Sequence, residues 1–284
     1  MLDDFAVFIL THGRADNVIT YKTLQRAGYT GRVYIVIDNE DKQAERYYQN
    51  FGDKVIMFDK AAEAEKTDTG DNFTERNTVL FARNACFDIA ERLGIEYFLV
   101  LDDDYTAICY TFDNQYKYIN NERAWVKSAD YFFEIVLNYY KISNLDFIAL
   151  GQSGDKIGGK DSFISVRTKR KAMNSFFCST SKRFNFVARM NDDVTSYVTY
   201  GNKGVIYITI FNAFVYQMTT QAQEGGLTKM YLDYGTYTKS FYTVMYQPSS
   251  VKVGLMGDTH KRLHHSIDWD TTVPCIISEQ WRRE

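Results

Sequence analysis

Short apolar runs alternate with amphipathic stretches over the first hundred residues. Residues 5–10 and 32–37 are apolar runs of strand length, and residues 17–27 between them have the spacing of a helix. The pattern continues with a charged helix over 41–51, a strand over 54–58, a helix with the apolar stripe Val79, Ala82, Cys86, Ile89 and Leu93, and a strand over 96–101. This order predicts an α/β fold with a mostly parallel central sheet and helices on both faces.

The second half is less regular, and we expect it to complete the same domain. Its predicted elements are a helix over 124–141, strands over 147–150, 162–167, 172–178, 205–210 and 213–218, and a short helix after residue 193. Four glycines within 151–160 predict a loop. Since no repeat or linker divides the 284 residues, the sequence predicts a single domain, with a first half over 1–105 and a second half and tail over 106–284.

Composition and charge exclude several classes of protein. Hydrophobic residues make up 45% of the chain and charged residues 24%, as in proteins that fold by themselves. The formal net charge of −3 is unlike that of proteins that coat nucleic acid, so any DNA contact must come from a local patch. No apolar run reaches the roughly 18 residues of a membrane helix, and the first residues lack the basic flank of a signal peptide, so we expect a cytoplasmic protein without membrane contact.

Three polar clusters follow predicted strands, at residues 11–14, 38–39 and 102–104. In parallel sheets, ligands bind beyond the carboxyl ends of the strands, where these clusters would meet. Asp102, Asp103 and Asp104 repel one another, and a divalent cation with bound phosphates would supply the missing counter-charge. The alternative is a solvated acidic loop.

Four segments carry a resemblance to known enzymes: residues 8–14, the strand end at 37–38, Arg83-Asn84, and residues 101–104. Together they resemble the nucleotide-binding half of glycosyltransferases with the GT-A fold. With residues 224–227 and the tail over 257–269, the chain resembles more narrowly the TET-associated glycosyltransferases of bacteriophages.

The resemblance implies a metal-dependent hexosyl- or pentosyltransferase that uses a nucleoside diphosphate sugar, a UDP-sugar being favoured, with Mn²⁺ or Mg²⁺. The implied acceptor is 5-hydroxymethylcytosine or another 5-hydroxymethyl pyrimidine in phage DNA, and the implied location is the cytoplasm of the host cell. Inversion at the anomeric carbon is the favoured stereochemistry. The first half would bind the nucleotide sugar and the second half the acceptor.

The resemblance also assigns the sugar-donor site. Thr11, Gly13 and Arg14 would line the nucleotide pocket, Asp38 would accept a hydrogen bond from the base, and Arg83 would approach the diphosphate. A surface charge at Arg14 and a helix cap at Asp38 are the simpler alternatives.

The same resemblance assigns the acidic triplet and a histidine. Asp102 would contact the ribose or the sugar, and Asp104 would bind the metal. Asp103 occupies the variable middle position of the family's Asp-x-Asp motif. It therefore stays open which pair of the three aspartates ligates the ion, and Asp102 is a candidate ligand beside Asp104. His264, in the segment with His260 and His265, would complete the metal shell, and a basic surface turn is the alternative.

A second acidic site is Asn191-Asp192-Asp193, placed before a predicted helix as the catalytic base is in inverting members of the fold. Direct displacement needs a carboxylate that removes the proton of the acceptor hydroxyl. Asp193 is our first choice and Asp192 the second, with helix capping as the alternative for both.

A local basic cluster is formed by Arg167, Lys169, Arg170 and Lys171. Such a cluster could follow a DNA backbone, and a solvated strand edge is the competing interpretation.

Three other functions remain open from the sequence. The first is a glycosyltransferase acting on glycan or protein. A metal-dependent nucleotidyltransferase would use similar carboxylates, although residues 11–14 are a poor version of its glycine-rich phosphate loop. The third is a non-catalytic DNA-binding module, which the negative net charge disfavours.

Overall fold

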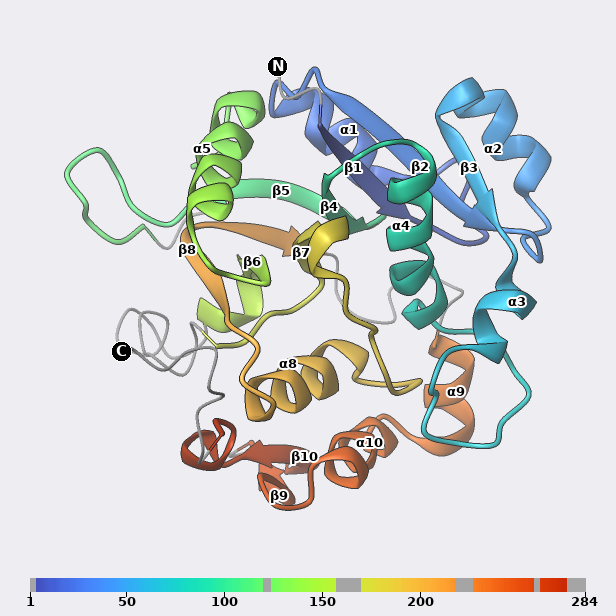
Figure 1. Cartoon of the computed structure of the whole chain (residues 1–284), viewed down its shortest axis with the longest axis vertical. Coiled ribbons are helices and arrows are strands. Elements are labelled where there is room, and N and C mark those ends of the chain that lie inside the picture. The colour runs from blue at the N-terminus through green and yellow to red at the C-terminus, as the bar shows by residue number, and fades with distance from the viewer. Residues whose placement is uncertain (1–3, 120–123, 157–169, 218–226, 258–260, 275–284) are drawn as a thin grey trace.

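The structure is a computed structural model that describes residues 4–119, 124–156, 170–217, 227–257 and 261–274. Its centre is an eight-stranded sheet in the order β3-β2-β1-β4-β7-β6-β8-β5 (Figure 1). The strands are β1 (Phe5–Leu10), β2 (Arg32–Asp38), β3 (Val55–Phe58), β4 (Tyr97–Asp102), β5 (Tyr105–Tyr110), β6 (Phe147–Gln152), β7 (Ser175–Ser179) and β8 (Tyr207–Gln217).

Four of the seven strand pairings are parallel, so the mostly parallel α/β sheet is confirmed. The strands predicted at 205–210 and 213–218 form one strand, β8, because the break in their pattern is a bulge against β6. The β7 strand starts at Ser175, later than predicted, because Asn174 has a φ of 53°. The strand predicted over 162–167 lies outside the described residues.

Helices cover both faces of the sheet, as predicted. The helices are α1 (Ile19–Arg26), α2 (Ala44–Phe51), α3 (Lys60–Glu65), α4 (Leu80–Arg92), α5 (Ala129–Ile142), α8 (Asp192–Asn202), α9 (Thr228–Tyr234) and α10 (Thr238–Tyr246). Short 3₁₀ turns are η1 (Gly52–Lys54), η2 (Ser153–Lys156), η3 (Thr180–Lys182) and η4 (Trp269–Thr271). No helix among the described residues is long and apolar enough to cross a membrane.

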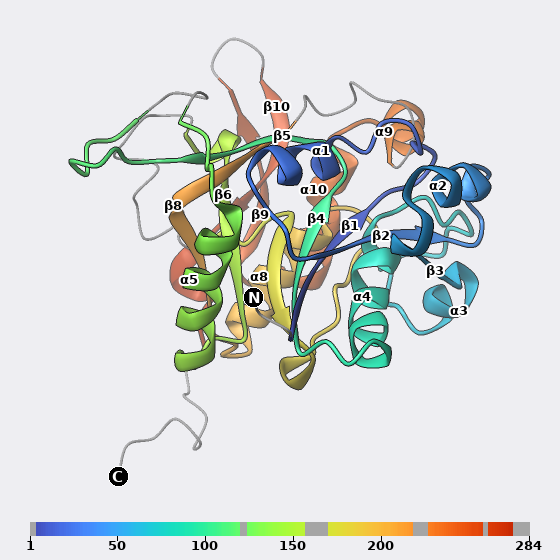
Figure 2. The same cartoon turned by 90° about the horizontal axis from the view of Figure 1, so that it is seen from above.

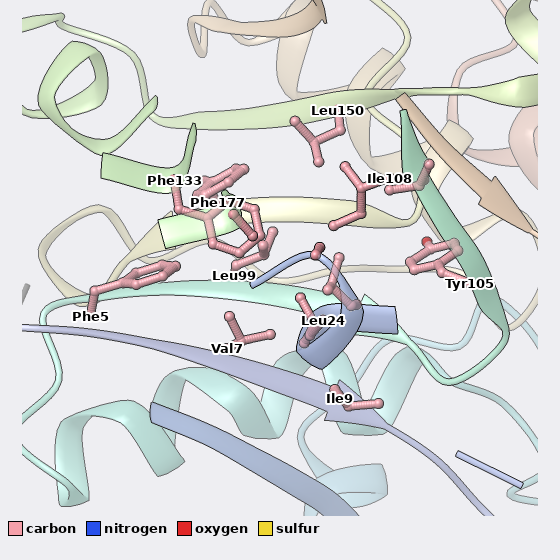
Figure 3. Close-up of a cluster of buried hydrophobic side chains, with 14 of the residues drawn as sticks. Phe5, Val7, Ile9, Leu24, Leu99, Tyr105, Ile108, Phe133, Leu150 and Phe177 are labelled. Carbon is pink, nitrogen blue, oxygen red and sulfur yellow. The ribbon is translucent and has the colours of Figure 1, made fainter. Parts of the chain in front are cut away.

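Alternation along the strands creates two cores. Phe5, Val7 and Ile9 of β1 face the core that α1, α2 and α5 cover, which Figure 3 shows in part. The alternate residues of β1, which begin with Ala6 and end with Leu10, face the opposite core, which α4 and α8 cover. A strand buried on both faces reads as an unbroken apolar run, which is why β1 was predictable from sequence.

The C-terminal part forms a third layer that the sequence did not predict. The hairpin β9 (Val251–Met256) and β10 (Arg262–Ile267) packs with α10, and α10 packs on α8. Figure 1 shows α8 between the sheet and this layer.

The region around β5 differs from the prediction at the start of α5, and it also carries an extended arm. The helix predicted over 124–141 starts at Ala129, because residues 124–126 instead bond to β5 through the backbone. Residues 111–119, just before the gap in the description, form an arm that extends from the body in both views (Figures 1 and 2).

The sheet brings the three predicted polar clusters to one edge. In the parallel pairings, Leu10 at the end of β1 aligns with Val36 on one side and with Asp102 on the other. Residues 11–14, 38–41 and 102–104 therefore leave the sheet next to one another.

Candidate active site where β1, β2 and β4 end

Asp103 holds the turn after β1. Its Oδ2 accepts a hydrogen bond from Thr11 Oγ1 at 2.6 Å, and its Oδ1 accepts one from Arg14 Nη1 at 2.8 Å. The Tyr47 hydroxyl lies 2.8 Å from Thr11 Oγ1 and accepts from the backbone N–H of Arg14. Burial raises the pKa of Asp103, although Arg14 and Thr11 favour its charged form. Both carboxylate oxygens of Asp103 thus have protein partners.

Asp104 has an oxygen that calls for a partner. Its Oδ1 is buried and has no hydrogen-bond partner among the described residues, whereas Oδ2 accepts from Gln217 Nε2 at 3.3 Å. Burial, together with the charges of Asp102 and Asp103, raises the pKa of Asp104 to about 7. A cation would relieve both the repulsion and the missing hydrogen bond, so the chemistry of Asp104 Oδ1 suits a divalent metal.

Arg83 connects the acidic triplet with the acidic pair that begins α8. The residue is 1% exposed, its Nη1 lies 2.5 Å from Asp192 Oδ2, and its Nη2 lies 3.4 Å from Asp102 Oδ1. Nη2 also donates to Asn174 Oδ1 at 2.9 Å. Burial and the neighbouring Asp193 and Asp102 raise the pKa of Asp192 despite Arg83. The guanidinium therefore binds protein carboxylates. The predicted contact between Arg83 and a diphosphate stays a prediction.

Asp38 ends β2 as predicted, in a buried network. Its Oδ2 accepts from Lys60 Nζ at 3.1 Å and lies 2.7 Å from His12 Nδ1. Burial would raise its pKa, but His12 and Lys60 outweigh this and lower it. Gly13 has a φ of 70°, open to glycine, and its N–H donates to Asp41 Oδ2 at 2.7 Å. The first two strand ends are thus tied together by charge and by backbone.

The predicted catalytic pair begins α8. Asp192 and Asp193 are 5% and 7% exposed, and Asp193 Oδ1 accepts from the backbone N–H of Val194 at 2.7 Å. The N-cap is Asn191, whose side chain makes no capping bond. Of the alternative capping role, the structure shows one part: Asp193 accepts from a backbone N–H of the first turn.

His264 belongs to the two-stranded C-terminal sheet, whereas the acidic triplet lies at the end of a strand of the eight-stranded sheet. It is on β10, its ring centroid is 4.1 Å from that of His265, and His265 Nδ1 lies 3.1 Å from Asn191 Nδ2. Burial and nearby cations lower the pKa of His264. In the described ranges, no three His, Cys, Asp or Glu side chains form a group able to hold a metal, so His264 does not join Asp102 and Asp104 in such a group. His260 is outside those ranges.

The predicted basic cluster is only partly described. Arg167 and Lys169 lie outside the described residues, as do residues 224–226. Arg170 donates to backbone oxygens of Trp269 and Thr272 and lies 5.2 Å from the Trp269 ring centroid. Lys171 is 39% exposed at its side chain, with an acidic neighbour 3.9 Å away in η2. Of the two described members, Arg170 thus holds the C-terminal segment, while the side chain of Lys171 is partly exposed.

Several contributors were missed from the sequence. Lys60, Asn174 and Gln217 reach the site from distant segments, and no local pattern sets them apart. His12 lies within the 11–14 cluster, so its position was the one available signal.

Comparisons with known proteins give a family and a fold. The family model described as TET-Associated Glycosyltransferase matches residues 5–226. None of the curated proteins matches the chain. Among solved structures, the crystal structure of a mycobacterial protein aligns with a TM-score of 0.50 and 8% identity, covering 93% of this chain and 83% of that one. This likeness concerns the fold alone.

Proposed function

Because the chain belongs to the TET-associated glycosyltransferase family, we propose that it transfers a sugar from a nucleoside diphosphate sugar to a hydroxymethyl group on DNA. The favoured acceptor is 5-hydroxymethylcytosine or another 5-hydroxymethyl pyrimidine, and a UDP-sugar is the favoured sugar donor. The observation that carries the proposal is the buried Asp104 Oδ1, which has no hydrogen-bond partner in the described part of the chain, at the edge where β1, β2 and β4 end.

The metal would be held by Asp104 and Asp102. A bound Mn²⁺ or Mg²⁺ supplies positive charge that stabilises the departing diphosphate. Asp103 does not need to bind the ion, because it already orders the Thr11–Arg14 turn against which the nucleotide would lie. Asp38, with its charge kept by Lys60 and His12, supports a hydrogen bond to the base.

Asp193 is the proposed base, with Asp192 second. Asp192 is engaged by Arg83, whereas the Asp193 carboxylate has the N–H of Val194 as its hydrogen-bond donor. A carboxylate with a free lone pair can take the proton of the acceptor hydroxyl as that hydroxyl attacks the anomeric carbon. Attack opposite the leaving diphosphate gives inversion.

The acceptor assignment follows the family name and the local chemistry of the surface. A hydroxymethyl group at C5 of a pyrimidine lies in the major groove of duplex DNA, and a base can also be extruded into a pocket. Lys171 offers exposed positive charge for the backbone, and Arg167 and Lys169 remain proposed members of the same cluster. A glycan or protein acceptor is the competing possibility.

The test is a transfer assay with a panel of nucleotide sugars and Mn²⁺ or Mg²⁺. Hydroxymethylated DNA, unmodified DNA and simple glycans would be offered side by side, and the products would be weighed by mass spectrometry. A mass gain of one sugar on hydroxymethylated DNA only is expected. Transfer to glycans alone would reject the DNA acceptor, and absence of transfer from every sugar donor would reject the proposed reaction.

A further inference from the structure

Arg189 lies buried just before the two aspartates that begin α8. It is 2% exposed, and its guanidinium donates to both oxygens of Asp71 at 2.8–3.0 Å. It also donates to the backbone oxygens of Phe73 and Glu75. The side chain therefore closes the loop between α3 and α4 onto the segment that enters α8.

Other elements hold the same segment. The Tyr242 hydroxyl of α10 donates to Asp71 Oδ2 at 2.5 Å. The backbone N–H groups of Ala188 and Arg189 donate to the carbonyls of residues 68–69 at 3.0 and 2.9 Å. Three parts of the chain that are far apart in sequence thus fix the path into α8.

The path itself is unusual for non-glycine residues. Ala188 has a φ of 75° and Asn191 a φ of 55°, so both are left-handed. Such conformations persist only where the surroundings determine them, and they gather at functional sites. Arg189 lies between the two, and residues 192–193 follow directly.

We infer that Arg189 is a positioning residue that sets where the Asp193 carboxylate stands. The inference rests on the proposed function, in which Asp193 removes the acceptor proton. Without the Arg189–Asp71 contact, Ala188 and Asn191 can relax toward ordinary backbone angles, which rotates the first turn of α8. The carboxylate then leaves its place for attack, while the sugar-donor site at the strand ends keeps its own contacts.

The experiment compares Arg189→Met, Arg189→Lys and Tyr242→Phe with wild type and with Arg183→Met. Arg183 pairs with Asp88 at the surface and serves as the matched control. For each variant, kcat and KM for transfer are measured, the affinity for the nucleoside diphosphate is measured by calorimetry, and folding is checked by circular dichroism. A displacement of about 1 Å lowers turnover by about a hundredfold. We expect that loss in kcat for Arg189→Met, a smaller loss for Arg189→Lys, and nucleotide affinity within threefold of wild type.

The other possible results decide separately on the role of Arg189 and on the proposed function. Wild-type kcat in a folded Arg189→Met overturns the inference, and so does a loss that appears only in nucleotide affinity. If Arg189→Met does not fold, the two conservative variants decide: a kcat within threefold of wild type in both overturns it. If wild type transfers no sugar, the proposed function fails instead, and if Asp193→Asn is as active as wild type, the assignment of Asp193 as the base fails.

Discussion

The Arg83 guanidinium lies 2.5 Å from the Asp192 carboxylate, in a position that is 1% exposed. Arg83 comes from the first turn of α4 and Asp192 from the start of α8, and Asp102 at the end of β4 contacts the other terminal nitrogen of the guanidinium. One buried cation therefore neutralises an acid from each of the two proposed functional sites. The distance between those sites is set by the packing of α4.

Removal of this cation should destabilise the fold. Arg83→Met leaves buried carboxylates without their counter-charge, and breaking such a pair costs about 3–5 kcal/mol of unfolding free energy. The double variant Arg83→Met/Asp192→Asn should recover part of the loss, because one of the charges is gone. Urea unfolding measures both, with Arg183→Met as the exposed control. Equal stability of Arg83→Met and wild type would contradict the role of Arg83.

Asp104 should be needed for turnover but not for folding. Its Oδ1 makes no hydrogen bond within the described residues and its Oδ2 accepts one from Gln217 at 3.3 Å, so Asp104→Ala or Asp104→Asn removes little that holds the fold. We expect transfer to fall by at least about a hundredfold, as for groups that stabilise developing charge, with unfolding free energy close to wild type. Asp53→Asn, at an exposed 3₁₀ turn, is the control. Near-normal transfer by Asp104→Ala would reject the metal assignment.

Asp193→Asn should separate binding from chemistry. The amide cannot accept the acceptor proton, and general base catalysis contributes about 10²- to 10⁴-fold. Transfer should fall by that factor, while calorimetry with the nucleotide sugar gives the wild-type affinity. Asp192→Asn should instead act on stability through Arg83. If the two variants exchange these behaviours, Asp192 is the base.

The strand ends were predictable because their signals are local. An apolar run such as 5–10 followed directly by polar residues marks a buried strand and its exit, and parallel pairing then brings the exits together. The three clusters that meet at the sheet edge are therefore those that the sequence indicated. The proposed ligand came from the family resemblance, because strand patterns do not carry that information.

The remaining features depend on tertiary contacts. The carboxylate that accepts hydrogen bonds from Arg189 is 118 residues away in sequence. The amide that donates to Asp104 is 113 residues away. Nothing in the local spacing of either residue indicates its partner. Arg170 illustrates the converse: its basic neighbours predicted a DNA contact, but Trp269 provides a nearby ring and carbonyl that the sequence does not connect to it.

Arg170 and Lys171 should therefore behave differently although they are adjacent. Arg170→Met removes charged hydrogen bonds to residues 269–272, which contribute about 1.5–3 kcal/mol each in buried settings, and should lower the unfolding free energy. Lys171→Met should lower stability less than Arg170→Met does, because its acidic neighbour is 3.9 Å away, and should reduce the salt dependence of DNA binding by about one phosphate contact. Melting curves and binding titrations at several salt concentrations test the pair. A lower salt dependence in Arg170→Met alone would return that residue to the acceptor surface.

The contribution of the Asp71 contact to stability should depend on pH in the acid range. Burial would raise the pKa of Asp71, but hydrogen bonds from Arg189 and Tyr242 outweigh it and hold the pKa below the ordinary 3.8. Asp71 also contributes to raising the pKa of Tyr246 on α10, after burial and Asp68. Because the folded protein binds the proton less tightly than the unfolded chain, the stabilisation is present above about pH 4 and is lost as the pH falls through the folded value.

Asp71→Asn should accordingly be less stable than wild type at pH 7, by about 1.5–3 kcal/mol for a charged hydrogen bond. The difference should narrow at pH 3, where wild type also begins to lose the carboxylate charge. Urea unfolding of both proteins at the two pH values measures this, and Asp53→Asn, whose carboxyl is exposed, should show no comparable change. A gap between Asp71→Asn and wild type that stays constant from pH 7 to pH 3 would mean that the charge on Asp71 does not hold Arg189, and that the loop is fixed by its backbone hydrogen bonds alone.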